Sequence, residues 1–210
     1  MKHIFKTLVF VSLLFPSLSA QPPKIILETE HLYFRPFVES DLEQLFKMYS
    51  DKEVMKYIPM EKALGKKIDK VTIKEMLDFF IEHQKKHGYS HWAAFEKGSN
   101  EFVGRIGLVK SDKDDQKESN KDVAEAGYIM HKKFWGKGYA TESMRKIINW
   151  TFSNTNVTKI ISIADPKHVA SKRVMEKVGM HFEKEGVWFG ITFVVYKINR
   201  PTPLSWIKQF

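Results

Sequence analysis

The chain alternates between short apolar runs and longer segments in which apolar residues recur with helical spacing. The short runs contain β-branched and aromatic residues and are bounded by turn-forming residues, a pattern typical of strands. They cover residues 25–37, 91–96, 102–110, 123–130, 159–164, 186–189 and 192–198. We expect the second and third of these strands to form a hairpin, because Gly98, Ser99 and Asn100 between them favour a turn.

Between these runs, apolar side chains recur every three or four positions. This spacing predicts helices at residues 42–49, 53–58, 72–87, 140–152 and 170–178. Ser40 with Glu43 and Thr72 with Glu75 have the spacing of capping boxes, and Pro59 is expected to end the second helix. The order of strands and helices predicts an α/β (α+β) fold with a mixed, largely antiparallel sheet flanked by helices.

The composition is that of one globular domain with a sizeable core. The chain has 210 residues, of which 43% are hydrophobic. It has no cysteine, which excludes disulfides, thiolate metal sites and a cysteine nucleophile. The net charge of +9 allows an acidic partner, but the lysines are interleaved with Asp and Glu, so a solvated basic surface is expected and nucleic acid is not. The charged segment 110–122 is expected to be a solvated loop.

The turn at residues 134–143 carries the most informative chemistry. Gly136 and Gly138 follow the strand at 123–130 and open the helix at 140–152. Glycine permits a sharp turn and a close approach of the backbone to a ligand, and the first N–H groups of a helix bind phosphate oxygens. The spacing matches neither a P-loop nor a dinucleotide-binding fingerprint. A purely structural turn between strand and helix is the alternative.

The motif Trp-Gly-Lys-Gly-Tyr-Ala-Thr-Glu-Ser at residues 135–143 resembles the acetyl-coenzyme A (acetyl-CoA) pyrophosphate loop of GNAT N-acetyltransferases. The resemblance is to the branch that includes the ribosomal-protein-alanine N-acetyltransferases (RimJ/RimL-like). Segments 32–37, 102–108 and 170–180 fit that branch in the same order, and the similarity covers residues 25–198. It implies a GNAT fold, acetyl-CoA as cosubstrate, an amine acceptor held beside the first helices, and no metal. Residues 199–210 form a C-terminal tail beyond the domain.

The resemblance implies a set of cofactor contacts. Met130 would offer a backbone N–H to the thioester carbonyl, and Ser171 would contact the cofactor's arm. His168 stands where many relatives have an asparagine that contacts the cofactor. The loop itself would bind the pyrophosphate through Trp135, Gly136, Lys137, Gly138, Tyr139, Ala140 and Thr141.

Transfer of an acetyl group to an amine requires placement of the reactants, a base and a stabilised oxyanion. Glu125 is the candidate base, because it shares a strand face with Ile129; a structural carboxylate is the alternative. Ser171 is a candidate to protonate the departing thiolate, to contact the cofactor or to cap its helix. Other branches place an acid tyrosine where this chain has Met175, so an acyl-CoA-binding module without turnover stays open.

Further side chains are candidates on the acceptor side. Arg35 and Trp188 are two of them, with packing in the core or against a strand as the alternative for Trp188, and Tyr128 is expected near the cleft. His83, His87 and His91 recur at intervals of four, but Gly88 interrupts the helix between them. We therefore expect solvated histidines and no metal site.

Residues 1–22 have the pattern of a secretory signal: a basic start, an apolar core at residues 8–15 and small residues at 17–20. The apolar core is too short to span a membrane comfortably. Acetyl-CoA is cytosolic, which favours a cytoplasmic enzyme with an uncleaved extension. Export or membrane tethering, including a basic binding protein on the same fold, is the alternative. The acceptor and the oligomeric state stay open.

Overall fold

The computed structural model describes residues 24–111, 122–188 and 190–201. The signal-like segment 1–22, nearly all of the charged segment 110–122 and most of the tail lie outside these residues. The first predicted strand, 25–37, is wrong as a single strand. It divides into β1 (Leu27–Glu28) and β2 (Leu32–Arg35), which pair antiparallel. The chain turns between them because the Thr29 N–H donates to the Leu32 carbonyl at 2.8 Å.

The helices follow the predicted order, with one addition. They are α1 (Leu42–Tyr49), α2 (Lys52–Met55), α3 (Met60–Leu64), α4 (Lys70–His87), α5 (Tyr139–Asn154) and α6 (Val169–Lys177), with 3₁₀ turns η1 (Glu39–Asp41) and η2 (Lys132–Phe134). The short helix α3 was not predicted. Pro59 is its N-cap residue, so this proline precedes a helix as well as following one.

Both predicted capping boxes are wrong. Helix α4 begins earlier than expected, because the Asp69 side chain accepts the Thr72 N–H at 2.8 Å. Thr72 lies inside the helix, and its hydroxyl donates to the Lys67 carbonyl. At the start of α1, Asp41 rather than Ser40 ties the chain, accepting the Val38 N–H at 2.9 Å. In each case a neighbouring aspartate makes the bond expected of the serine or threonine, but only Asp69 caps its helix through the side chain.

The sheet has the strand order β1-β2-β3-β4-β5-β6-β8-β7, and its pairs are antiparallel except β5 with β6. Its remaining strands are β3 (His91–Glu96), β4 (Phe102–Lys110), β5 (Val123–Met130), β6 (Lys159–Ala164), β7 (His181–Trp188) and β8 (Ile191–Asn199). The predicted mixed, largely antiparallel sheet and the β3–β4 hairpin are confirmed. Strand β7 begins at His181, well before the predicted start at 186.

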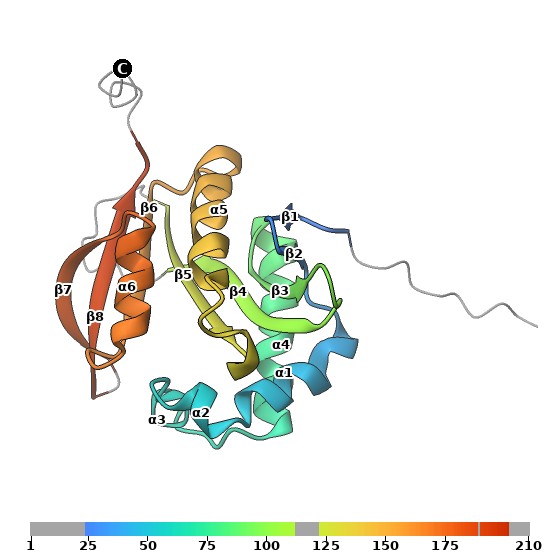
Figure 1. Cartoon of the computed structure of the whole chain (residues 1–210). Helices are drawn as coiled ribbons and strands as arrows, with labels where there is room; N and C mark the ends of the chain where they lie inside the picture. The colour runs from blue at the N-terminus through green and yellow to red at the C-terminus, as the bar shows by residue number, and fades with distance from the viewer. Residues whose placement is uncertain (1–23, 112–121, 189, 202–210) are drawn as a thin grey trace, which may run out of the picture.

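The parallel pair is short and leaves a gap in the sheet. Its rungs join Val123 to Lys159, Ala124 to Ile160 and Glu125 to Ile161, and no rung follows. Beyond Glu125 the two strands diverge, as Figure 1 shows. Beyond Glu125 the edge of β5 that faces β6 is not paired with that strand, so its backbone N–H and C=O groups can bond a ligand.

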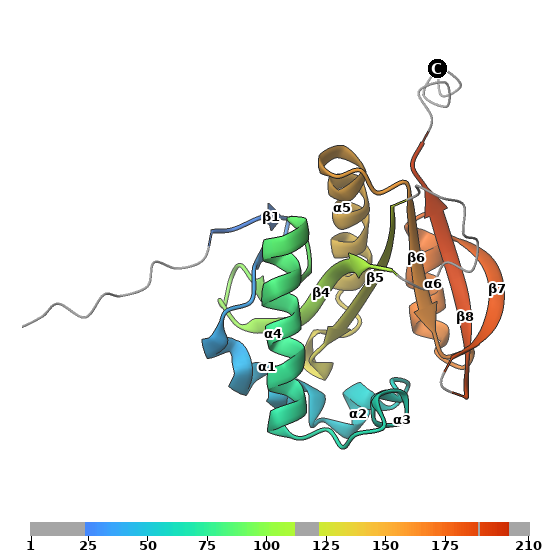
Figure 2. The ribbon, with the colours of Figure 1, turned by 180° about the vertical axis from the view of Figure 1, so that it is seen from behind.

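Helices cover both faces of the sheet. Helices α5 and α6 lie on the face toward the viewer in Figure 1, and α1 and α4 lie on the face toward the viewer in Figure 2. Each face has its own buried cluster: Met144, Ile147 and Met175 belong to the first, and Leu45 and Leu77 to the second. The sheet therefore separates two apolar layers, and the β5–β6 gap is where a ligand can pass between them.

Candidate active site

Two cavities meet at the gap between β5 and β6. One, of about 700 Å³, is lined by the end of β5, the glycine turn and the first turns of α5 and α6; we name it the glycine cavity. The other, of about 400 Å³, lies toward α4 and is lined mainly by apolar side chains; we name it the apolar cavity. The residues common to both walls are Tyr57, Ile58, Tyr128, Ile129, His168 and Ser171.

The glycine turn presents backbone to the glycine cavity. Gly136 and Gly138 have φ of +76° and +84°, which favour glycine, and a Cβ at either would meet no other atom within 4 Å. Gly138 is the N-cap of α5, and no side chain caps this helix. At this turn the Glu142 N–H donates to the Gly138 carbonyl at 3.1 Å. The preceding N–H groups, at the positive end of the helix dipole, suit an anionic ligand.

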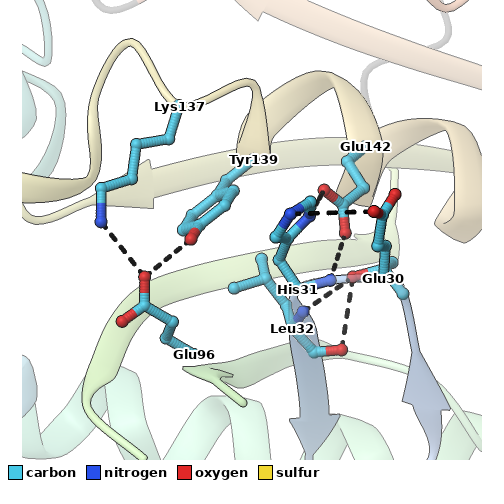
Figure 3. A network of polar contacts seen from close by, with 8 residues as sticks. Glu30, His31, Leu32, Glu96, Lys137, Tyr139 and Glu142 are labelled. Atoms are coloured by element: carbon cyan, nitrogen blue, oxygen red, sulfur yellow. Dashed lines mark hydrogen bonds and ion pairs between the residues drawn. The ribbon is translucent and has the colours of Figure 1, made fainter. Parts of the chain in front are cut away.

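The structure brings together nearly all the residues predicted to contact the cofactor. Those lining the glycine cavity are Met130, Trp135, Gly136, Gly138, Tyr139, Ala140, Thr141, His168 and Ser171. Lys137 is the exception, because it does not line the cavity. Its side chain, expected to add a positive charge beside the phosphates, points to β3 instead. Its Nζ is 3.2 Å from Glu96 Oε1 (Figure 3).

The bonds around Glu96 fasten the glycine turn to β3. The Tyr139 hydroxyl donates to Glu96 Oε1 at 2.6 Å, beside Lys137 (Figure 3). These bonds, with one from Ser99, lower the pKa of Glu96 to about 2, the Tyr139 bond contributing most. One turn further along α5, Glu142 accepts the His31 N–H at 3.0 Å. Glu96 at the end of β3 and His31 in the turn between β1 and β2 thus hold the start of α5 in place.

The edge of β5 that faces the gap offers donors. The His131 N–H donates to Val103 in β4, so the alternate residues Tyr128 and Met130 point their backbone groups toward the gap. The Met130 carbonyl is already bonded, because it accepts the Trp135 indole N–H at 2.9 Å. The N–H of Met130 therefore faces the gap with no strand opposite it, at the position expected from the sequence.

Basic side chains surround the glycine cavity, a feature that sequence reasoning missed. Lys56, Lys167, Arg173 and Lys177 line it, with Glu53 as the acidic residue among them. Arg173 and Lys177 lie one turn apart on α6, and this i,i+4 spacing of basic residues was the signal available in the sequence. The resulting positive potential suits a ligand with several phosphates.

Tyr128 and Ser171 join β5 to α6 where the two cavities meet. The Tyr128 hydroxyl donates to Ser171 Oγ at 3.0 Å, and burial raises the pKa of Tyr128 to about 12. Ser171 lies inside α6, whose N-cap is His168, so the capping role considered for Ser171 is wrong. The His168 ring stacks on Tyr57 at 4.5 Å between ring centroids.

The apolar cavity contains a few polar groups among its apolar walls. Helix α4 contributes Phe79 and Phe80, and the polar side chains include Glu125, Arg105 and His91. Arg105 pairs in register with Ile129, so Arg105 and Glu125 lie on the same face of the sheet. Glu125 stands at the last rung of the β5–β6 pair, on the cavity wall.

The structure corrects the predictions made for three other residues, one arginine and two histidines. Arg35 lies outside both cavities, with its guanidinium bonded to the Asp41 carboxylate at 2.7 Å. His83 and His91 are buried rather than solvated. The ring of His83 fills a structural role, because its Nδ1 lies 2.7 Å from the Tyr89 carbonyl and its Nε2 accepts the Lys110 N–H.

Within the described ranges, no group of three His, Asp or Glu side chains is placed to hold a metal ion. Trp188 lies outside both cavities and packs near Phe193, at 6.0 Å between ring centroids. For the same ranges, no helix is long and apolar enough to cross a membrane.

Comparisons with known proteins agree with this geometry. The family model described as "Acetyltransferase (GNAT) domain" matches residues 31–181. The uncharacterized protein YkkB of Bacillus subtilis is 33% identical over 162 residues, which are 77% of this chain and 88% of YkkB.

Solved structures share the fold. A GNAT-family acetyltransferase from Bacillus anthracis superposes with a TM-score of 0.67 at 24% identity, covering 83% of this chain and 98% of that one. RimL, a ribosomal L7/L12 α-N-protein acetyltransferase solved with coenzyme A, gives 0.66 at 14% identity, covering 84% and 98%. The family match and the fold confirm the resemblance seen in the sequence. This chain belongs to the GNAT family and is an acetyl-CoA-dependent acetyltransferase.

Proposed function

We propose that this protein transfers the acetyl group of acetyl-CoA to a primary amine, either a protein N-terminus or a small molecule, by direct attack. One observation carries the proposal. The uncapped start of α5 opens on the glycine cavity, and this cavity meets the apolar cavity at the β5–β6 gap. Such an arrangement lets two reactants enter from opposite faces of the sheet and meet at one point.

The glycine cavity fits the coenzyme in its chemistry. The N–H groups of residues 138–141 would bind the pyrophosphate, and the basic side chains Lys167, Arg173 and Lys177 would approach the other phosphate charges. The free edge of β5 would pair with the amide groups of the coenzyme's arm. When bound, acetyl-CoA supplies the activated thioester.

The transfer itself requires one bond to form and one to break. The amine nitrogen attacks the thioester carbonyl carbon, and the Met130 N–H stabilises the oxyanion. Glu125, on the wall of the apolar cavity, takes the proton that the amine loses. The C–S bond then breaks, and the Ser171 hydroxyl, held by Tyr128, gives its proton to the thiolate. Glu125 releases the proton it took to solvent, and Ser171 recovers one from solvent, which restores both groups. The products are an amide and free coenzyme A.

An acceptor screen tests this proposal. The protein is mixed with acetyl-CoA and panels of primary amines, including N-terminal peptides, polyamines, aminoglycosides and amino acids. Release of the free thiol is followed, and mass spectrometry checks each candidate product for a gain of one acetyl group. The proposal predicts amine-dependent thiol release with an acetylated product. Tight acetyl-CoA binding without transfer to any amine would support an acyl-CoA-binding module instead.

The proposed reaction bears on location. Acetyl-CoA is a cytosolic metabolite, so we propose that the enzyme works in the cytoplasm. Fractionation of cells that make the full chain should recover it with soluble cytosolic proteins, whereas a shortened chain outside the cytoplasm would show that residues 1–22 direct export.

A further inference from the structure

Arg105 places a positive charge on the wall of the apolar cavity. Arg105 is half-buried with its Nε atom fully buried, and among the described residues it forms no salt bridge, although charged groups removed from water are usually paired. Its neighbours are the Phe80 ring, 5.6 Å from the guanidinium carbon, and the hydroxyl of Tyr49. Neither neighbour carries a negative charge at neutral pH, because burial raises the pKa of Tyr49.

Two polar atoms on this wall have no hydrogen-bond partner in the described part of the chain. They are Arg105 Nε and His91 Nδ1, and His91 is only 7% exposed. The two side chains lie on one face of the sheet, because His91 pairs in register with Gly107 and Arg105 is two residues before Gly107 on β4. Burial, and then the charge of Arg105, hold the pKa of His91 well below its usual value. Buried polar groups in folded proteins nearly always have a partner, and leaving one unpaired is costly. Both atoms lie in residues that line the apolar cavity, so a ligand there can supply the partners.

This face of the sheet carries one negative and one positive side chain, at two separate positions. Glu125 stands at the β5–β6 gap, and Arg105 lies on β4 in register with Ile129, four residues beyond Glu125. The remaining titratable groups on the wall are Asp165, His168 and the tyrosines, of which Asp165 is at the α6 side. A ligand with a positive amine toward Glu125 and a negative group toward Arg105 matches this distribution.

We propose that the acceptor is a small amino acid-like molecule whose carboxylate binds Arg105, with its apolar body against α4. This inference rests on the proposed function and names the substrate class. A carboxylate fits better than a phosphate, because the planar fork of one guanidinium matches two carboxylate oxygens and balances one charge. A cavity of about 400 Å³ with Phe79 and Met76 on its wall suits an apolar body.

Matched ligands with one carbon skeleton test the inference. One set is phenylalanine, 2-phenylethylamine and 3-phenylpropanoate; the other is 6-aminohexanoate, hexylamine and hexanoate. Acetylation of the first two members of each set is measured as kcat/KM, with wild type, Arg105→Gln, Arg105→Lys and Tyr49→Phe. Binding of the third, a carboxylate without an amine, is measured by calorimetry in the presence of coenzyme A. Acetyl-CoA affinity of each variant shows that the fold is intact.

We expect at least one carboxylate-bearing amine to be acetylated at least about 10-fold better than its partner lacking the carboxylate. In Arg105→Gln its kcat/KM should fall about 10- to 100-fold, the range for a lost charged hydrogen bond, while the neutral amine keeps its rate. Arg105→Lys should restore part of the preference, and Tyr49→Phe, the milder change, should weaken it. Equal losses for both amines, or no preference in wild type, would overturn the inference and leave Arg105 with a structural role.

The binding arm separates this inference from the proposed function. If no amine is acetylated, the proposed function fails. Carboxylate binding by wild type that is lost in Arg105→Gln would still support the anionic subsite. The inference is overturned if wild type binds neither of the two carboxylates that lack an amine and shows no preference for an amine that bears a carboxylate. This holds whatever the amine screen finds. Acetylation limited to peptides that begin with acidic residues would also overturn it, by assigning Arg105 to a protein acceptor.

Discussion

Glu125 stands at the point where the sheet opens, and its side chain reaches the apolar cavity. If it accepts the amine proton, Glu125→Gln keeps the shape of the side chain and removes the base. We predict that kcat falls about 100-fold or more, the usual contribution of a positioned base, while acetyl-CoA binds as before. For wild type and Glu125→Gln, kcat is measured by stopped assays with the best acceptor, and acetyl-CoA affinity is measured by calorimetry. An unchanged kcat would remove Glu125 as the base.

Tyr128 acts through Ser171 in the proposed reaction, because its hydroxyl donates to Ser171 Oγ. It is therefore a positioning residue. We predict that Tyr128→Phe lowers kcat about 10-fold with little change in KM, and that adding it to Ser171→Ala costs nothing further, since the two act as one unit. Fully additive losses in kcat for the double variant would mean that the two hydroxyls act independently.

His91 makes the stability of the fold depend on pH. Burial lowers its pKa well below the usual value of a histidine, so the folded protein keeps it neutral while the unfolded chain takes up a proton below about pH 6.5. We predict that the free energy of unfolding falls as the pH drops from 7 to 5, and that His91→Gln flattens this dependence. Urea titrations at several pH values measure it. Parallel pH profiles for the two proteins would contradict the assignment.

The glycine turn is an element fastened from one side. The Tyr139 and Lys137 side chains bond Glu96 on β3 (Figure 3). The backbone of the turn lines the glycine cavity. This placement explains why a loop lysine is absent from the cavity wall. The turn is held by side chains and exposes its backbone to the ligand.

The bonds of Glu96 with Tyr139 and Lys137 stabilise the fold only while Glu96 is ionised, and its low pKa sets the pH at which this contribution is lost. The pKa of Glu96 is about 2 in the folded protein and about 4.5 in the unfolded chain, so its contribution to stability is complete above about pH 4.5 and is lost as the pH falls toward 2. We predict that Glu96→Gln is less stable than wild type at pH 6 and that the difference shrinks between pH 4.5 and 2. Glu75→Gln is a matched control, because it removes an exposed carboxylate that pairs with Lys66, and at pH 6 it should change stability little. A difference in stability between Glu96→Gln and wild type that stays constant from pH 6 to pH 2 would show that the ionised Glu96 does not stabilise the fold through these bonds.

Sequence patterns predicted most elements but not how each begins. Periodicity identified α4, yet Asp69 rather than Thr72 caps it, because aspartate and threonine both cap well and local sequence does not rank them. The helix α3 is short and has no buried residue, so it produced no apolar stripe to read. The single strand expected at 25–37 became a hairpin, because the turn at Thr29 depends on backbone bonds that apolar alternation does not report.

At the scale of the whole molecule, the site is formed where two parts of the sheet separate. Strands β1–β5 and β6–β8 share only the short β5–β6 pair, and the cavities on the two faces meet beyond it. The sequence motif predicted the glycine turn at the start of α5, because glycines and a helix start are local features. Arg105 and the basic side chains of α6 were missed, because their roles depend on which strands and helices become neighbours.

The most direct test of the central claim is acetyl-CoA binding by calorimetry to wild type, Gly138→Val and Gly88→Val. Gly88 also has a positive φ, of +76°, and no atom near its Cβ position, but it ends α4 and lies outside both cavities. Both variants therefore impose similar backbone strain. The account predicts micromolar binding by wild type and Gly88→Val, and its loss in Gly138→Val. Equal affinity in all three proteins would show that the glycine turn is not where the coenzyme binds.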